Sequence, residues 1–459
     1  MLGDAFLRIA SDWRGSFSRA ASFRRSVALA LGYLCWIGRS TTSGAILALH
    51  QGDRDWSAYY RVCSQAPWEA DGLFDAALKE ALRWVSGDWV VSAVDDTRLK
   101  KTGRKIVGAQ WQRDPLSPPF RANLIYALRF MQCSVLLPLH LTPECRARAI
   151  PIGFELAPCV KKPGRRASEE EIHAYKLEIK ERNLSVTFTQ SVAHARRRLD
   201  ALGAASKVHV VTVDGGFCNK RCLSDIPERT VILARARKDA RLCFHAEPGT
   251  RKIYARAKFT PEEVRGDGSI PYETVKVFFG GAVRELRFKR VENVLWQGGT
   301  KTRPLTLLVL APTAYKNTKS ARLLYRNPAF LLCTSTGLDA VRLIQAYLDR
   351  WQIEVNHQEE KDVLGVGQAQ VWSEKAIPRQ PALAVAAYSV LLLAALSAFG
   401  PGRTEAYPEL PKWRKYQRRP SIRDILVLIR SELDNPSTAV NQFVNAPPGF
   451  RGLVRTAAA

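Results

Sequence analysis

Two short apolar runs that end in aspartate constrain the fold most. Residues 88–97, DWVVSAVDDT, are rich in valine and end in two adjacent carboxylates, Asp95 and Asp96. Residues 207–216, KVHVVTVDGG, stop in the same way at Asp214, before a Gly-Gly turn. Apolar runs of this length and composition predict buried strands. The sequence therefore predicts a sheet with carboxylates at the ends of its strands.

Further predicted elements extend this pattern. Strands are expected within residues 99–114, 122–141 and 230–238. A helix is expected to begin at Ser168, where Glu171 completes a capping box, and to run to about Gly203. The order strand, strand, strand, helix, strand, strand, followed by a late acidic helix, matches the connectivity of a ribonuclease H-like core. We therefore predict an α/β chain with a ribonuclease H-like mixed sheet flanked by helices.

The charge of the chain favours an anionic partner. Its 459 residues contain 69 Lys and Arg against 43 Asp and Glu, which gives a formal net charge of +26. Nucleic acid is the commonest partner of so basic a protein, and a generally basic surface without a specific partner is the alternative. The nine cysteines are scattered and include no pair of CxxC motifs. This pattern fits a reducing cytosol, so we expect a cytoplasmic, nucleoid-associated bacterial protein.

One segment is apolar enough to cross a membrane. Residues 381–400, PALAVAAYSVLLLAALSAFG, carry no charge over twenty positions, which is long enough for a bilayer. A helix buried on all sides in a large core has the same composition. The alanine content and the two serines favour the buried helix, so no membrane partner is expected.

A polar stripe is predicted on the helix of residues 347–361, YLDRWQIEVNHQEEK. At about 100° per residue, Tyr347, Arg350, Glu354 and Lys361 fall within a stripe roughly 60° wide. An ion pair between Arg350 and Glu354, four residues apart, would explain two of these residues on an ordinary exposed face. The alternative is a functional site.

Carboxylates at three separate places indicate a metal site. An aspartate at a strand end is, by itself, most often a turn residue. Asp214, Glu354 and one of the pair Asp95 and Asp96 together supply the hard oxygen ligands that Mg²⁺ prefers. Alternation along the strand does not decide between the two neighbouring aspartates. The few histidines and the absence of an HExxH motif argue against a zinc hydrolase.

These residues resemble a known family. The stretch from Tyr347 to Lys361 resembles the Y-(2)-R-(3)-E-(6)-K signature of bacterial DDE transposases of the insertion sequence 4 / 701 type. VDDT is similar to the first acidic motif of that family, in which the metal ligand directly precedes threonine, and this points to Asp96. VDGGF is similar to the second motif, with Asp214 followed by Phe217. The resemblance covers about residues 88–400.

The resemblance implies a chemistry. Asp96, Asp214 and Glu354 would be the catalytic residues and the ligands of Mg²⁺, with Mn²⁺ as a substitute. The expected function is that of a DNA transposase, which cleaves transposon ends and transfers the strands into target DNA by a cut-and-paste route. The expected partners are terminal inverted repeats, target DNA and a second copy of the chain on paired ends.

Basic residues near these motifs are expected to bind DNA. Arginine offers a bidentate fork to phosphate, lysine a point charge and tyrosine a hydroxyl donor. The expected phosphate-binding residues are Tyr347, Arg350, Lys361, Lys101, Arg104, Arg237 and Lys238. Trp296, beside a Gly-Gly turn, is a candidate for base stacking, and a tryptophan in a hairpin core is the alternative.

Five segments are predicted along the chain. The alternating pattern and the Gly-Gly turns after residue 240 indicate a β-rich insertion. The boundaries are 1–85 for a helical, DNA end-binding domain, 86–239 for the first part of the core, 240–335 for the insertion, 336–400 for the second part of the core, and 401–459 for a basic linker and helix. Two alternatives to a transposase remain: a metal-dependent nuclease of the same fold without strand transfer, and an inactive DNA-binding remnant.

Overall fold

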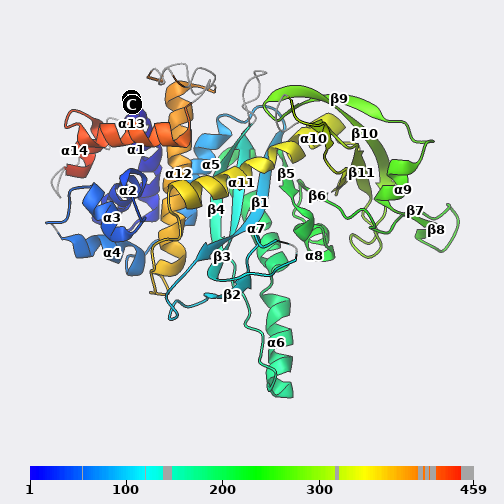
Figure 1. Cartoon of the computed structure of the whole chain (residues 1–459), viewed down its shortest axis with the longest axis horizontal. Helices are drawn as coiled ribbons and strands as arrows, with labels where there is room; N and C mark the ends of the chain where they lie inside the picture. Colours follow the sequence, from blue (N-terminus) through cyan, green and yellow to red (C-terminus); the bar gives the residue numbers. More distant parts are fainter. Residues whose placement is uncertain are drawn as a thin grey trace.

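The protein combines a large mixed sheet with helices at both ends of the chain (Figure 1). A computed structural model describes residues 1–53, 55–118, 120–137, 147–315, 320–401, 407–408, 413 and 420–445. Most of the predicted linker and the end of the predicted tail lie outside the described residues.

The centre of the sheet has the strand order of a ribonuclease H-like fold. Its strands are β1 (Trp89–Lys100), β2 (Gln110–Arg113), β3 (Leu124–Leu137), β4 (Arg148–Leu156), β5 (Val208–Val213) and β6 (Thr230–Arg235). β3 runs antiparallel to both β1 and β4, whereas β5 is parallel to β1 and β6 is parallel to β5. The spatial order β4–β3–β1–β5–β6, with parallel and antiparallel pairs, is that of a mixed sheet and confirms the predicted fold class.

The β-rich insertion continues this sheet. Four long strands extend it beyond β6 in the order β14, β11, β10, β9, and β14 pairs antiparallel with β6. The elements of the insertion are β7 (Leu242–His245), β8 (Tyr254–Phe259), α9 (Pro261–Gly266), β9 (Glu273–Phe279), β10 (Ala282–Val294), β11 (Leu305–Leu310), β12 (Ala314–Tyr315), β13 (Leu324–Tyr325) and β14 (Ala329–Cys333). β7 pairs with β8, and β12 with β13, in two small separate sheets.

Helices of the N-terminal end pack against one central helix, α12 (Ala376–Phe399), and the C-terminal helices pack on those N-terminal helices. This is the predicted apolar helix. It is long and apolar enough to cross a membrane, but 89% of its most apolar window is buried inside the protein. The helices near it are α1 (Leu2–Ser11), η1 (Asp12–Ser16), α2 (Ala20–Cys35), α3 (Thr42–Ala48), α4 (Trp56–Ser64), α5 (Asp71–Leu82), α13 (Ile422–Asp434) and α14 (Ala439–Asn445).

The two ends of the chain therefore form one helical unit, although they were predicted as separate segments. The carboxylate of Glu432 in α13 accepts hydrogen bonds from the backbone N–H groups of Leu2 and Gly3, at 3.1 and 2.7 Å. This carboxylate satisfies free donors of the first turn of α1. Because α12 is apolar on every side, it must be covered on every side, and α1, α2, α4, α5 and β4 pack against it.

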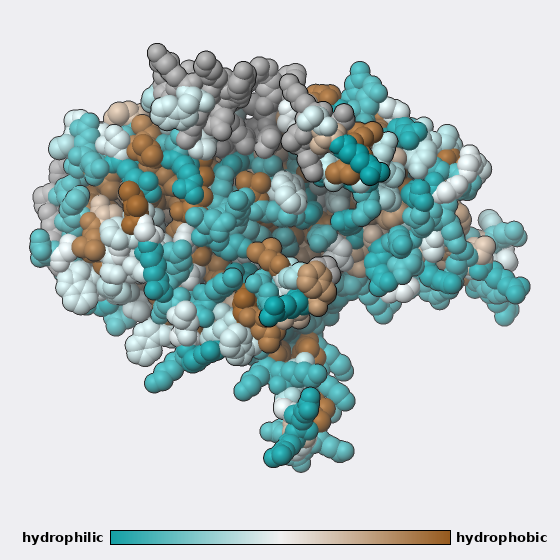
Figure 2. Space-filling view, viewed as in Figure 1, coloured by the Kyte–Doolittle hydropathy of each residue, from teal (hydrophilic) through white to brown (hydrophobic). Residues whose placement is uncertain are grey.

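The helix predicted from Ser168 to about Gly203 is two helices. α6 (Glu169–Glu181) ends at Arg182, and α7 (Leu184–Leu199) begins after Asn183, whose side chain accepts a hydrogen bond from the N–H of Val186. α7 packs against β3 and β4 and continues into the π-helix η3 (Asp200–Ala204). α6 has no buried residue and projects from the body, and the surface around it is mostly hydrophilic (Figures 1 and 2).

Candidate active site

Asp95 and Asp214 lie on the same face of the sheet. The parallel register pairs Ala93 of β1 with Thr212 of β5. Two residues further along each strand, the same register places Asp95 beside Asp214, which directly follows β5. Side chains two residues apart on a strand point to the same face. The two carboxylates therefore sit at adjacent strand positions. Asp214 directly follows its strand, as predicted, whereas β1 continues to Lys100, so Asp95 lies within its strand and not at the predicted end.

Asp96 points to the opposite face. Its Oδ2 atom lies 2.7 Å from Nε of Arg129 and 3.4 Å from Nη1 of Arg98. Both arginines and Asp96 are largely buried. The sequence analysis chose Asp96 as the first metal ligand, but the structure does not bring Asp96 to Asp214. Successive residues of a strand alternate between faces, so only one of the two aspartates reaches that side.

The helix that carries Glu354 covers the Asp95 face. α10 (Ala340–Asp349) begins at Asp339, whose side chain caps it, and α11 (Trp351–Gln358) follows after Arg350. Ile353 of α11 is fully buried against Ala93 of β1, together with residues of β3 and β4. Because Ala93 and Asp95 share a face, α11 lies over the face that presents Asp95. The three carboxylates of Asp95, Asp214 and Glu354 thus belong to one side of the sheet.

The electrostatics of Asp95 are those of a crowded acidic site. Burial raises its pKa to about 7, and the negative charges of Asp96 and Asp214 add to this shift. The N–H of Asp96, which donates to Oδ1 of Asp95 at 2.8 Å, and the positive charge of Arg350 act in the opposite direction. A pKa so far above the usual range indicates that a further positive charge would stabilise the ionised form.

Arg350 and Tyr347 lie within this acidic group. Nη2 of Arg350 lies 3.0 Å from Oε1 of Glu354, and the Arg350 side chain is only 12% exposed. Burial raises the pKa of Tyr347, the charges of Arg235 and Arg350 lower it, and those of Asp214 and Glu354 raise it. The structure therefore brings three of the four stripe residues, Tyr347, Arg350 and Glu354, to the neighbourhood of Asp214.

Arg235 is a candidate that the sequence analysis did not single out. It ends β6, and the register of β5 with β6 pairs Val213 with Ala234, so Arg235 comes next to Asp214. Its positive charge lowers the pKa of Tyr347. The pattern of two adjacent parallel strands, one ending in an acid and the next in arginine, was visible in the sequence, but its meaning depended on the register.

Lys361 lies beyond a change in the winding of this helix. The helix changes at η5 (Glu359–Val363) into a π-helix, which turns less per residue than an α-helix. Lys361 is half-buried. Burial lowers the pKa of His357, and the positive charge of Lys361 lowers it further. Burial raises the pKa of Glu360, and the charge of Lys361 acts against that rise. The expected stripe assumed one regular helix as far as Lys361, so a role of Lys361 in binding phosphate stays a prediction.

Lys101 does not offer its ammonium group to a ligand. The side chain is buried, and Nζ donates to the carbonyl oxygens of Gly367 and Ala369 at 2.7 and 2.8 Å. Its pKa is lowered to about 8 by burial, with a smaller contribution from Arg39. The expectation that Lys101 binds phosphate is therefore incompatible with its position. Lys101 instead connects the end of β1 to the segment that follows η5.

The other expected DNA contacts lie at the surface. The guanidinium of exposed Arg104 lies over the rings of Trp111 and Tyr126, at 4.7 and 4.8 Å from their centroids. Arg237 pairs with Asp239 at 2.7 Å and is 82% exposed, and Lys238 is also exposed.

Trp296 is half-buried and packs against two hydrophobic clusters. Its ring lies so close to Gly299 that a Cβ there would meet it at 2.2 Å. This packing matches the alternative of a tryptophan in a hairpin core. A role in base stacking stays a prediction.

The chemistry of the donors on the Asp95 face fits a divalent cation. Asp95, Asp214 and Glu354 offer carboxylate oxygens only, which Mg²⁺ and Mn²⁺ prefer. Within the described residues, no group of three His, Cys, Asp or Glu side chains stands close enough together to hold a metal ion. Glu354 is turned to Arg350, so its carboxylate would have to exchange that partner for a shared cation.

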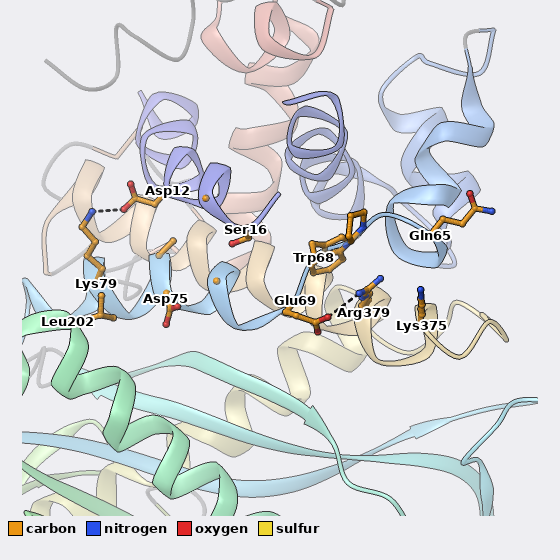
Figure 3. Close-up of a pocket in the computed structure, with 14 residues that line it drawn as sticks. Asp12, Ser16, Gln65, Trp68, Glu69, Asp75, Lys79, Leu202, Lys375 and Arg379 are labelled. Carbon is orange, nitrogen blue, oxygen red and sulfur yellow. Dashed lines mark hydrogen bonds and ion pairs between the residues drawn. The ribbon is translucent and has the colours of Figure 1, made fainter. Parts of the chain in front are cut away.

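A cavity in the helical unit is not this site. It measures about 980 Å³ and lies between η1, α5 and the start of α12 (Figure 3). Its charged side chains are paired: Lys79 with Asp12 at 2.8 Å and Arg379 with Glu69 at 3.2 Å. Arg379 also lies over the ring of Trp68. Paired charges without a converging acidic or basic set give this cavity no chemistry of its own.

Comparisons with known proteins agree with an acidic nuclease site. Residues 13–303 match the family described as DDE superfamily endonuclease, and this region contains Asp95, Asp96 and Asp214 but ends before α10. A comparison with curated protein sequences finds no match.

Among solved structures, a piggyBac transposase synaptic complex with hairpin DNA is similar over 99% of this chain and 80% of that chain. The identity is 12% and the TM-score 0.35, so no residue assignment rests on it. The match to the family of DDE superfamily endonucleases spans more than half of the residues of this chain, so the chain belongs to that family.

Proposed function

We propose that this endonuclease is a DNA transposase that cleaves transposon ends and joins them to target DNA. The observation that carries the proposal is the meeting of Asp95, Asp214 and the Glu354 helix on one face of a ribonuclease H-like sheet. The YxxRxxxExxxxxxK spacing of residues 347–361, which resembles the insertion sequence 4 / 701 type, supports transposition in particular.

In this proposal Asp95, Asp214 and Glu354 hold the divalent cation. Bound Mg²⁺ would activate the attacking oxygen and stabilise the leaving oxygen of a phosphodiester. Asp95 replaces Asp96 in the proposed ligand set, because the register and not the motif decides which carboxylate faces Asp214. The raised pKa of Asp95 supports this choice, since a cation at this position would favour its ionised form.

Arg350, Tyr347 and Arg235 are the proposed phosphate contacts nearest the acids. Arg350 is held in place by Glu354 and can present its remaining N–H groups to a phosphate oxygen. Tyr347 offers a hydroxyl donor that is ordered by burial. Arg235 extends the basic rim beyond Asp214. Arg104, Arg237 and Lys238 are exposed and belong to the outer DNA surface in this proposal.

The partners follow from the charge and from the reaction. A net charge of +26 favours binding to DNA, and such binding should weaken steeply with salt. Cutting two ends in concert requires two active sites, so we propose a homodimer on paired terminal repeats. We place this reaction in the bacterial cytoplasm, at the nucleoid.

A change of Glu354 to Gln tests the site. Glu354→Gln keeps the size of the side chain but removes a charged ligand, so Mg²⁺-dependent cleavage of the element's ends should fall roughly a hundredfold or more. DNA binding in the absence of metal should be retained. Glu285→Gln, on the exposed part of β10, is a matched control and should cleave normally. Retained cleavage in Glu354→Gln would refute the assignment.

A nuclease without strand transfer is the second candidate, and the family match to endonucleases favours it as much as a transposase. The two are separated by supplying a pre-cut end with a free 3′-hydroxyl together with target DNA. A transposase joins the two molecules, whereas a simple nuclease leaves the end unjoined. An inactive remnant would neither cut nor join.

A further inference from the structure

The hairpin formed by residues 101–126 exposes an unusual set of side chains. This segment, the β2–β3 hairpin, connects β1 to β3 and contains β2. Five of its large hydrophobic side chains are more than half exposed: Val107, Trp111, Leu116, Phe120 and Leu124. Phe120 and Leu116 are the extremes, at 91% and 87%. So many exposed apolar groups within one segment mark a binding surface more often than a chance arrangement.

The exposed side chains are not a consequence of a loose loop. Within the turn, Asp114 N–H donates to the carbonyl of Asn123 at 2.8 Å, and Asn123 N–H donates to the Ser117 hydroxyl at 2.9 Å. The N–H of Leu116 donates to Oδ1 of Asp114 at 3.0 Å. These polar groups of the turn are thus hydrogen-bonded to one another, and the apolar side chains are directed outward.

Positive charge surrounds the apolar side chains. Arg104, Lys105, Arg113 and Arg121 are all exposed on the same hairpin. Trp111 and Tyr126 meet edge to face, with ring centroids 5.7 Å apart, and the Arg104 guanidinium lies over both rings. With Arg104 in this position Trp111 is still 56% exposed, so much of its ring remains open to a ligand.

The hairpin is connected to the proposed active site. Asp95 pairs with Gln132 across β1 and β3, and Tyr126 lies six residues before Gln132, so Tyr126 shares the Asp95 face. Trp111 pairs with Tyr126 across β2 and β3. Lys101, at the base of the hairpin, binds the carbonyls of Gly367 and Ala369, in the segment that follows the Glu354 helix. The hairpin is therefore joined both to the sheet that carries Asp95 and to the segment that follows the Glu354 helix.

We propose that the β2–β3 hairpin binds unpaired bases of a DNA strand beside the cleavage site. A single strand presents flat apolar bases and anionic phosphates together, and the hairpin offers aromatic rings, apolar side chains and arginines together. Duplex DNA keeps the faces of its bases stacked inside the helix and exposes phosphates and groove edges to such a surface, and a second protein chain would have to be acidic as well as apolar. The proposal rests on DNA being the substrate of this endonuclease, and it adds a site for strands that have separated.

The experiment measures binding of a fluorescent single-stranded oligothymidine in EDTA, so that it does not depend on cleavage. Trp111→Ala should weaken binding about tenfold, since stacking on one aromatic ring has about this value. Arg104→Lys keeps the charge but loses the planar group, so it should weaken binding by a smaller factor. Binding to a blunt duplex of equal length should change less than twofold in both variants. Phe244→Ala is the control, because Phe244 is 45% exposed and also packs against a second aromatic ring, that of Phe259, in the β-rich insertion.

Unchanged binding in Trp111→Ala would overturn the proposal, and so would an equal loss in Phe244→Ala. Light scattering on the same samples tests the competing occupant: a change of mass from dimer to monomer in Trp111→Ala, with single-strand binding intact, would assign the hairpin to a second copy. Arg104→Lys alters only an exposed side chain, so it gives a result even where Trp111→Ala folds poorly. A chain that binds single strands through Trp111 but never cleaves DNA would refute the proposed function and leave this site in place.

Discussion

The two faces of β1 place adjacent aspartates in opposite surroundings. On one face Asp95 is buried near Asp214, and its pKa rises to about 7. On the other face Asp96 is held by Arg129 at 2.7 Å and by Arg98 at 3.4 Å. Asp95 lacks a sufficient counter-charge, whereas the charge of Asp96 is compensated by two arginines. Only the first is suited to attract a cation, and the second is suited to hold strands together.

Neutralising each aspartate in turn is the most direct test of whether Asp95 and Asp96 have different roles. Asp95→Asn should reduce Mg²⁺-dependent cleavage roughly a hundredfold or more, because a ligand of the proposed metal is lost. Asp96→Asn is the matched variant one residue away and should retain most of the activity. Initial cleavage rates at saturating Mg²⁺ measure both. If Asp96→Asn lost activity and Asp95→Asn did not, the two faces would have to exchange roles.

Asp96 is instead expected to stabilise the fold through its ion pairs with Arg129 and Arg98. Asp96→Ala leaves Arg129 and Arg98 without their carboxylate in a largely buried position. Loss of a charged hydrogen bond of this kind costs about 2 kcal/mol of unfolding free energy. Urea denaturation measures the change, and Asp239→Ala, which removes the exposed partner of Arg237, should cost much less. Equal losses in the two variants would contradict a structural role for Asp96.

A smaller, pH-dependent effect is expected beneath the Asp95 face. Glu360 is fully buried, and its carboxylate accepts a hydrogen bond from Nε2 of Gln132, the cross-strand neighbour of Asp95. Burial raises the pKa of Glu360 to about 8, so the folded protein holds this proton more tightly than the unfolded chain. Its contribution to stability is therefore complete below about pH 4.5 and is lost as the pH rises through 8.

Glu360→Gln removes this dependence. The amide keeps the size of the side chain and a partner for Gln132, so the variant should gain stability relative to the wild type as the pH rises from 5 to 9. Thermal melting in metal-free buffer at several pH values measures the difference. Glu181→Gln, at the exposed end of α6, should leave the slope unchanged. A constant difference between Glu360→Gln and the wild type would show that Glu360 is already ionised at pH 5.

Much of the fold could be predicted because the strands and helices have recognisable local sequence patterns. The valine-rich runs ending at Asp96 and Asp214 are strands, and residues 381–400 form a buried helix. Their order along the chain predicts the ribonuclease H-like sheet, since connectivity limits which strands can be neighbours. The packing of the C-terminal helices α13 and α14 on α1 and α2 was not predicted, because nothing local in residues 1–85 or after 420 indicates these long-range contacts.

The candidate site was predicted less completely for the same reason. Asp214, Glu354, Arg350 and Tyr347 come together as expected. Lys361 was placed by assuming a regular α-helix, whereas the helix becomes a π-helix after Gln358, so its place in the stripe stays a prediction. Lys101 was taken for a surface lysine, but its ammonium is buried against two backbone carbonyls. Winding and burial depend on the packing partners of a segment, and these are distant in the sequence.

The sequence by itself determined the class of the sheet, the three acidic places and the basic charge that favours DNA. Tertiary structure decided which of the two adjacent aspartates belongs to the acidic group. Both aspartates satisfy the same motif, and a strand shows one of them to each face. Only the register of β1 against β5, together with the packing of Ile353 on Ala93, tells which face meets Asp214 and the Glu354 helix. Side-chain alternation is local, whereas the identity of the facing layer is set by contacts between residues far apart in the chain.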